Sequence, residues 1–264
     1  MFTLSISLST GDLPFLKDEL KHKLPEIRPT HRAELLARWY GFRTYASLRT
    51  ALSNSTTVTT NIDWESACQF LKKCGYEKSS VPLCDTSAKL ALRRVADKLP
   101  RLTQFGIGFG PRQANTDGTR ETSEQYNERF RQSREDLCTD YSAKAFLRSM
   151  AFLSEVGHIQ TFSDSGSYWV KHIAENFPSD YPCGKPLGPD YVPNGLLIAA
   201  AVHSGFRIRT NPPWPQCDDP NVSFNMSRRD LVDWDCKVRP TGAHAQAREH
   251  RNRARRRTFV VNHV

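Results

Sequence analysis

The sequence predicts a mainly helical α+β fold with one small antiparallel pair of strands near the C-terminus. Apolar residues recur every three or four positions in most segments, as Leu13, Leu16 and Leu20 do, and this is the spacing of a helix face. Capping residues, prolines and glycines stand at the ends of these segments. Only two short stretches, 206–209 and 222–224, alternate apolar and polar residues as strands do, and we expect them to pair.

The first part of the chain, residues 1–104, is predicted to be a helical N-terminal module. Its helices are bounded by capping side chains, prolines or glycines. They are expected at residues 13–24, 31–40, 45–52, 64–73 and 87–99. The expected capping residues are Thr30, Thr44, Asp63 and Ser87.

Residues 105–120 lack an apolar period and are predicted to be a linker. Their Gly106-x-Gly108-x-Gly110 run is followed by no lysine and no helix start, so it does not match a phosphate-binding loop. The main body, residues 121–236, should contain further helices and the strand pair, with an irregular proline-rich stretch at 178–189. The helices of this body are expected at residues 122–139, 141–156, 168–177, 193–203 and 227–234.

The composition predicts a cytoplasmic protein without a metal or cofactor. The chain has 7 cysteines, an odd number, and none of them form a Cys-x-x-Cys pair, so we expect reduced thiols. A metal site built from Cys183, Cys217, Cys236 and a histidine is the open alternative. No apolar run approaches the roughly 20 residues that span a bilayer, and the first residues do not resemble a signal peptide.

The positive charge of the chain is concentrated at its C-terminus. The formal net charge is +9, and residues 237–264 hold eight lysine or arginine residues against Glu249 alone. This segment is predicted to be a disordered tail, and its guanidinium groups are suited to nucleic-acid phosphates, without sequence specificity. The residues expected to make these contacts are Arg248, Arg251, Arg253, Arg255, Arg256 and Arg257.

One predicted helix carries a possible catalytic group. Tyr168, His172 and Glu175 fall on one face of the helix at 168–177, with Lys171 beside them. A histidine oriented by a carboxylate can act as a general base, although an ordinary contact between His172 and Glu175 is the simpler explanation of the pattern. Three segments could present Tyr168, Lys171, His172, Asn194 and Asn225 on one surface.

Two further patterns are weaker. Asp190 with Asp235 and Lys237 can be arranged as a metal-dependent nuclease site, but their separation and the loop position of Asp190 argue against it. The helix–glycine–helix unit at 31–52 suggests a DNA-binding helix-turn-helix, but its second helix lacks apolar residues at the required places. A plain helical hairpin is therefore expected there.

Three blocks in the second half, at 166–175, 191–201 and 221–227, carry a resemblance. They resemble a group of uncharacterised bacterial proteins encoded on plasmids and integrative elements, over roughly residues 125–234. The chain departs from that group at Pro193, where serine is more usual. The resemblance implies a mobile genetic element as the context, and it implies no activity.

The leading functional prediction is an accessory protein of a bacterial mobile genetic element, not an enzyme, that contacts DNA or RNA mainly through its tail. The first alternative is an enzyme acting at Tyr168, His172 and Glu175, which predicts a concave pocket there. The second is a protein-binding module that modulates a host system, which predicts an exposed apolar patch away from the tail. No membrane partner is expected.

Overall fold

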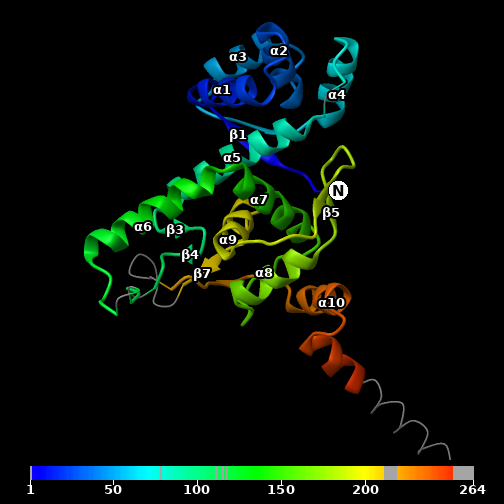
Figure 1. The fold of residues 1–264 in the computed structure, drawn as a ribbon. Coiled ribbons are helices and arrows are strands. Elements are labelled where there is room, and N and C mark those ends of the chain that lie inside the picture. The colour runs from blue at the N-terminus through cyan, green and yellow to red at the C-terminus, as the bar shows by residue number, and fades with distance from the viewer. Residues whose placement is uncertain are drawn as a thin grey trace, which may run out of the picture.

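The computed structural model describes residues 2–77, 79–110, 112–114, 116, 118–210 and 219–251. These residues form a mainly helical structure with four two-stranded antiparallel sheets, which confirms the predicted fold class (Figure 1). None of the helices within the described ranges is both long and apolar enough to cross a membrane.

The N-terminal region contains α1 (Leu13–Lys23), α2 (Pro29–Trp39), α3 (Tyr45–Ser53) and α4 (Trp64–Lys73). Two of the predicted caps are confirmed. The Thr44 hydroxyl accepts a hydrogen bond from the backbone amide of Ser47 at 3.1 Å, and Asp63 Oδ1 accepts one from Ser66 at 2.9 Å. The predicted cap Thr30 is wrong, because α2 already begins at Pro29, whose fixed φ suits the first turn of a helix.

A two-stranded sheet in this region was not predicted. β1 (Ser5–Leu8) pairs with β2 (Val58–Asn61), with Ser5 opposite Asn61. A short 3₁₀ helix, Thr10–Asp12, links β1 to α1. Ile6 and Leu8 of β1 are buried while Ser5 and Ser7 are partly exposed, so the strand has the alternation of a half-buried edge.

The helix predicted to begin at Ser87 in fact begins six residues earlier, as α5 (Val81–Lys98). Pro82 lies in its first turn, where the missing N–H costs nothing. Ser87 is buried in the middle of α5, and its hydroxyl bonds to Trp39 Nε1 at 2.8 Å and to Tyr40 Oη at 3.0 Å. The Ser87 hydroxyl therefore provides a hydrogen-bond partner for the buried Trp39, in α2, and for Tyr40, which directly follows α2. It does not cap a helix.

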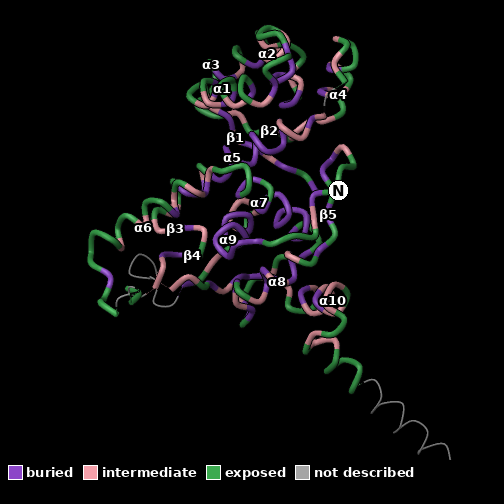
Figure 2. The backbone as a smooth tube through the Cα atoms, in the orientation of Figure 1, coloured by how far each residue is buried: buried purple, intermediate pink, exposed green. Residues whose placement is uncertain are grey.

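At the centre of the remaining helices lies α9 (Asn194–His203), which is buried along most of its length (Figure 2). α9 packs against α5, α7 (Asp140–Leu153) and α8 (Ser167–Asn176). α6 (Ser123–Glu135) and the 3₁₀ helix Asp136–Cys138 precede α7, and α10 (Arg228–Val238) follows α9. Residues 243–251 are helical as well. Ser227 caps α10, because its hydroxyl accepts a hydrogen bond from the Asp230 amide at 3.3 Å.

Three more hairpins are short. β7 (Ile208–Arg209) pairs with β8 (Ser223–Phe224), which confirms the predicted strand pair. The stretch 178–189 is not wholly irregular, since it contains β5 (Ser179–Asp180) and β6 (Pro186–Gly188). β3 (Leu102–Thr103) and β4 (Gly106–Ile107) form a hairpin at the start of the predicted linker.

Helices from the two sides of the predicted linker, residues 105–120, pack against each other. α5 belongs to the N-terminal side of that division, yet it packs against α7 and α9 on the other side. The β3–β4 hairpin also contacts α9. Buried apolar residues from both sides belong to one continuous core. The domain boundaries themselves stay a prediction.

Asp85, on α5, is a buried carboxyl with a consequence for stability. Burial raises its pKa, an effect that Lys23, the hydroxyl of Tyr181 and Lys144 partly oppose; the Tyr181 hydroxyl donates to Asp85 Oδ1 at 3.0 Å. A carboxyl whose folded pKa is raised contributes stability below its unfolded pKa, near 4, and loses that contribution as pH rises through the folded value.

We therefore expect Asp85→Asn to raise the free energy of unfolding at pH 7 relative to wild type and to leave it nearly unchanged at pH 4. The asparagine keeps an acceptor for Tyr181 and removes the buried charge. Urea unfolding at both pH values measures the difference, with Asp97→Asn, an exposed position on the same helix, as the control. An equal effect of Asp85→Asn at both pH values would contradict the expectation.

Candidate functional site

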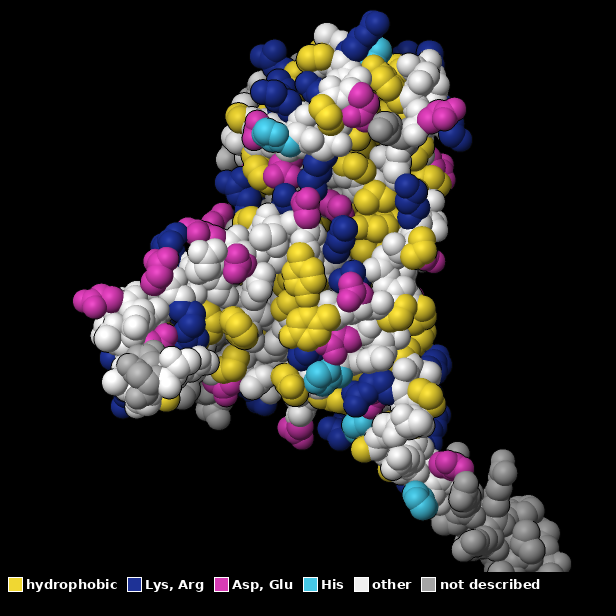
Figure 3. Space-filling model, in the orientation of Figure 1, with side chains coloured by type: hydrophobic (Ala, Val, Ile, Leu, Met, Phe, Trp, Pro, Cys, Tyr) yellow, Lys and Arg dark blue, Asp and Glu magenta, His cyan; other side chains and the backbone are white. Residues whose placement is uncertain are grey.

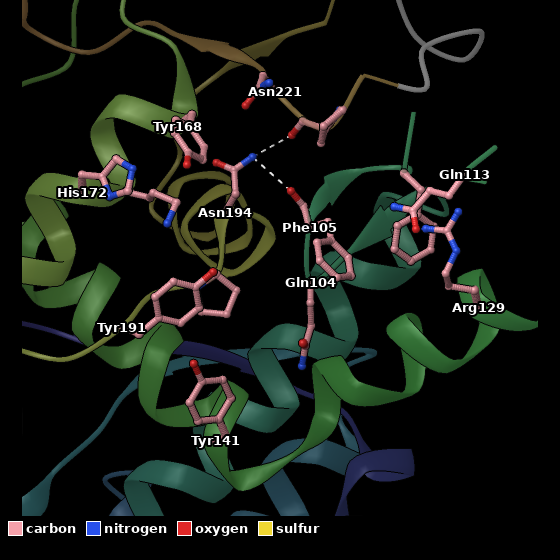
Figure 4. A pocket seen from close by; sticks show the side chains of 14 residues that line it. Gln104, Phe105, Gln113, Arg129, Tyr141, Tyr168, His172, Tyr191, Asn194 and Asn221 are labelled. Carbon is pink, nitrogen blue, oxygen red and sulfur yellow. Dashed lines mark hydrogen bonds between the residues drawn. The ribbon is translucent and has the colours of Figure 1, made fainter. Parts of the chain in front are cut away.

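The exposed large aromatic side chains of the described residues gather in one place. Phe105, Tyr141, Tyr168 and Tyr191 are 60%, 45%, 59% and 55% exposed, and no other large hydrophobic side chain in the described ranges is comparably exposed. All four line one cleft with a volume of about 680 Å³ (Figure 4). Hydrophobic side chains accordingly gather in the middle of the face seen in Figure 3. Such a grouping marks a binding surface, since single exposed aromatics are normally scattered.

Two glycines hold one wall of the cleft in place. The amide of Gly195, in the first turn of α9, donates to Gln104 O at 2.8 Å, and a Cβ at Gly195 would lie 1.8 Å from Thr103 O. A Cβ at Gly106 would lie 1.8 Å from Pro220 O. The β3–β4 turn is thus pressed between α9 and residues 219–221, and this contact presents Phe105 to the cleft.

The other wall is α8, which carries the residues predicted as a catalytic alternative. Glu175 accepts from Lys171 Nζ at 2.7 Å through Oε1 and pairs with His172 Nδ1 at 2.6 Å through Oε2. The Tyr168 and His172 rings meet edge to face with centroids 4.7 Å apart. The sequence predicted Tyr168, His172 and Glu175 on one helix face with Lys171 beside them, and in the structure Tyr168, Lys171 and His172 line the cleft.

The lysine of this wall also contacts aromatic rings. Lys171 Nζ lies 5.2 Å from the ring centroid of Tyr168 and 4.7 Å from that of Tyr191. Because the ring faces attract the ammonium group, Lys171 ties together two of the exposed aromatics.

The cleft is close to electrically neutral. Arg129, which lines it, makes two hydrogen bonds of 2.8 Å to the Glu121 carboxylate, through Nε and Nη2, and this pairing lowers the pKa of Glu121. Lys171 Nζ forms an ion pair with Glu175 Oε1 at 2.7 Å. Both permanently charged cations of the lining thus have a carboxylate partner, so the cleft suits a flat, uncharged group better than a phosphate.

Asn194 lies at the floor of the cleft with one polar atom unused. Its Nδ2 donates to Phe105 O at 3.2 Å and to Pro220 O at 2.8 Å (Figure 4). Its Oδ1 is buried and has no donor among the described residues. The predicted convergence holds for Tyr168, Lys171, His172 and Asn194, which all line the cleft.

The prediction for Asn225 is wrong. Its side chain is buried away from the cleft lining, with Nδ2 donating to Ile159 O at 2.9 Å and Oδ1 accepting from the Arg207 amide at 2.6 Å. Asn225 therefore joins two backbone segments next to β7 and β8. Its amide has a structural role because both of its polar atoms are already used.

Tyr191 is positioned by a buried arginine of α7. Arg148 donates from Nε to Leu187 O at 2.6 Å, from Nη1 to Tyr191 O at 3.3 Å, and from Nη2 to Asp190 Oδ2 at 2.5 Å. Asp190 is thereby an ion-pair partner of Arg148. Arg148 thus binds β6 at Leu187 and the following loop at Asp190 and Tyr191.

The first described part of the basic tail is attached to α8 from its other side. Asp235 is buried, and its Oδ2 accepts from Trp169 Nε1 at 3.2 Å and pairs with His244 Nδ1 at 2.7 Å. Arg248 is bound to Asp233 at 2.8 Å, whereas Arg251 is exposed. The predicted residues Arg253, Arg255, Arg256 and Arg257 lie outside the described residues.

Comparison of the chain with protein-family models, with curated proteins and with solved structures gives no match. The site is therefore interpreted from its own geometry. In the described part of the chain, no group of three histidine, cysteine, aspartate or glutamate side chains is placed to hold a metal ion. Cys217, one of the suggested ligands, lies outside those residues. The suggested nuclease carboxylates are bound elsewhere, Asp190 to Arg148 and Asp235 to Trp169 and His244.

Phe105, Tyr141 and Tyr191 are the site residues that sequence reasoning missed. They come from the β3–β4 turn, the first turn of α7 and the loop before α9, so no spacing along the chain connects them. The available indication was that Phe105 and Tyr191 are aromatic side chains in irregular segments, where they have no helix face to bury themselves in. Tyr141 lies within a predicted helix, and nothing in the sequence indicated that its ring is exposed.

Proposed function

We propose that the protein binds single-stranded nucleic acid, with unpaired bases stacking on the aromatic side chains of the cleft and phosphates contacting the arginine-rich C-terminal segment. The proposal rests above all on the gathering of Phe105, Tyr141, Tyr168 and Tyr191 around one cleft. The resemblance over residues 125–234 favours an accessory role on a bacterial mobile genetic element.

Aromatic rings are the common means by which proteins hold unpaired bases. Each stacked base contributes about 1–3 kcal/mol, and the π-face of any base is suitable. A base inside a duplex has no free face, so a stacking cleft selects single strands. The neutral lining supports the same conclusion, since a base without its phosphate is an uncharged flat group.

The phosphates need a separate source of positive charge. Residues 237–264 carry eight basic side chains and one acidic side chain. The two parts should therefore respond differently to salt: stacking is nearly independent of ionic strength, whereas arginine–phosphate contacts release counterions. This difference makes the contributions separable.

We expect the double variant Tyr168→Ala/Tyr191→Ala to bind a labelled single-stranded RNA at least about 10-fold more weakly than wild type, with an unchanged slope of log affinity against log salt. Both rings are largely exposed, so their loss should not unfold the protein. Replacing the six arginines at 248, 251, 253 and 255–257 with glutamine should reduce that slope by up to about 4, at roughly 0.7 per phosphate. Fluorescence anisotropy across a salt series measures both effects.

The matched control is Tyr168→Phe/Tyr191→Phe, which keeps the rings and should bind like wild type. Single-stranded DNA and a duplex of the same sequence complete the set. Binding of duplex and single strand with equal affinity, unaffected by the alanine variant, would contradict a role of the cleft and leave the tail as a simple electrostatic anchor.

A second candidate function has one specific observation in its favour. The pairing of His172 Nδ1 with Glu175 at 2.6 Å leaves Nε2 available on a side chain that lines the cleft. A carboxylate that holds Nδ1 in this way orients a histidine as a general base. The RNA recovered from the binding experiment is therefore also analysed for cleavage, and cleavage that disappears in His172→Gln would favour an enzyme.

A further inference from the structure

Resting on the proposed function, we propose that the cleft selects a nucleobase with an exocyclic amino group, as in adenine or cytosine, whose N–H donates to Asn194 Oδ1. This inference deepens the binding proposal by assigning a chemical preference to the same site. It depends on one side chain whose orientation is determined by its neighbours.

The orientation of the Asn194 amide follows from its donors. The two Nδ2 hydrogens are directed to Phe105 O and Pro220 O, at 3.2 and 2.8 Å. Exchanging the amide oxygen and nitrogen would place an oxygen against these two carbonyls, so the assignment is unambiguous. Oδ1 can only accept a hydrogen bond, and its ligand must therefore be a donor.

Among the nine buried side-chain polar atoms that have no hydrogen-bond partner in the described residues, only Asn194 Oδ1 belongs to a residue that lines the cleft. Asn194 is 7% exposed, and Oδ1 receives no donor from the described residues. A buried acceptor left without a donor destabilises a folded protein, and nearly all such groups are paired. An acceptor kept in this state on the floor of a cleft is completed when a ligand supplies the donor.

The surroundings of Oδ1 suit a flat ring. Figure 4 shows Oδ1 directed toward the side of the cleft that holds Tyr168 and His172, with Phe105 on the opposite side of Asn194. Oδ1 is closed to solvent as the side chains stand, so a ligand reaches it when a neighbouring side chain moves. Tyr168, at 59% exposure, can change rotamer readily, and its ring can then stack on the base whose edge faces Asn194.

The test compares ligands that differ only in the amino group. Full-length wild-type protein is titrated with an oligoadenylate and with the same oligonucleotide built from purine riboside, which lacks the 6-amino group. A second pair compares oligocytidylate with its 2-pyrimidinone analogue, which lacks the 4-amino group. Phosphate charge and ring size are the same within each pair, and we expect about 10-fold weaker binding without the amino group.

Asn194→Ala serves as the second measurement. It should lower the affinity for oligoadenylate to that for the purine analogue and abolish the preference. Thermal unfolding followed by circular dichroism checks that the variant folds, because the substitution also removes the bonds to Phe105 and Pro220. If Asn194→Ala does not fold, the comparison of the paired oligonucleotides on the wild-type protein tests the amino-group preference by itself.

Each outcome bears on the proposal. Equal binding of both members of each pair overturns the amino-group preference while leaving the stacking proposal intact, and this is also the result if a ribose hydroxyl is the donor. A preference that persists in a folded Asn194→Ala variant overturns the role of Asn194. Absence of binding to every oligonucleotide overturns the stacking proposal and this inference together.

Discussion

Replacing Gly195 with alanine is expected to lower the free energy of unfolding by about 3 kcal/mol or more. The new methyl group would lie 1.8 Å from Thr103 O and 2.9 Å from the carbonyl group of Gln104. The contacted atoms belong to the backbone of the β3–β4 hairpin, and Gly195 belongs to the buried helix α9, so neither element can move aside without a loss of packing. Overpacking of this kind costs about 1–3 kcal/mol or more. The bond from the Gly195 amide to Gln104 O would also be strained.

Urea unfolding measures the loss, and the oligonucleotide titration shows its effect on the cleft, because the displaced hairpin carries Phe105. Gly166→Ala is the matched control: Gly166 precedes the other cleft helix, α8, and a Cβ there meets no atom within 4 Å. Its φ of −74° suits alanine, and because Gly166 is the N-cap of α8, where alanine is less favourable than glycine, the change should cost less than about 1 kcal/mol. Equal stability of Gly195→Ala and wild type would show that the hairpin does not press on α9.

Replacing Arg148 with methionine is expected to cost about 2–4 kcal/mol of stability and to weaken single-strand binding. Methionine fills the apolar part of the space but leaves Leu187 O and Tyr191 O without their donor. An unsatisfied buried carbonyl costs about 1–3 kcal/mol. The loop of Tyr191 then loses its attachment to α7, and the stacking surface loses one of its rings.

Asp190→Asn separates the two contributions of this arginine. The Asp190 side chain is 55% exposed, so the ion pair is screened and its loss should cost less than about 1 kcal/mol. The carbonyl contacts of Arg148 remain in that variant. If Asp190→Asn were as destabilising as Arg148→Met, the ion pair and not the backbone contacts would hold the loop.

The helices were predictable because their limits are encoded locally. Thr44, Asp63 and Ser227 accept hydrogen bonds from amides only three residues away, so a short window of sequence contains the whole interaction. Ser87 belongs to the same residue class, yet its hydroxyl bonds to Trp39 and Tyr40, nearly fifty positions away. A buried partner that distant cannot be inferred from local spacing, and the start of α5 was misplaced for this reason.

The difference between local and distant contacts also explains why one wall of the cleft, α8, was predicted and the other, the β3–β4 hairpin, was not. Tyr168, Lys171, His172 and Glu175 share one helix, and helical geometry alone brings them together. The β3–β4 hairpin has only two residues in each strand, and it exists because Gly195 and Gly106 permit close contact with α9 and Pro220. Such short strands are stabilised by tertiary packing rather than by their own periodicity, so Phe105 was assigned to a linker.

The anchoring of the tail on α8 also has a kinetic meaning. Trp169 and His244 meet at Asp235 on one side of α8, while Tyr168 and His172, one to three positions from Trp169, line the cleft on the other. Under the proposed function, a strand held by the described part of the tail would be tethered within a short reach of the cleft. Binding of its bases then becomes an intramolecular step, governed by an effective concentration that short tethers raise to the millimolar range. A weak stacking cleft can in this way retain a strand that it would release at once if it met the same strand free in solution.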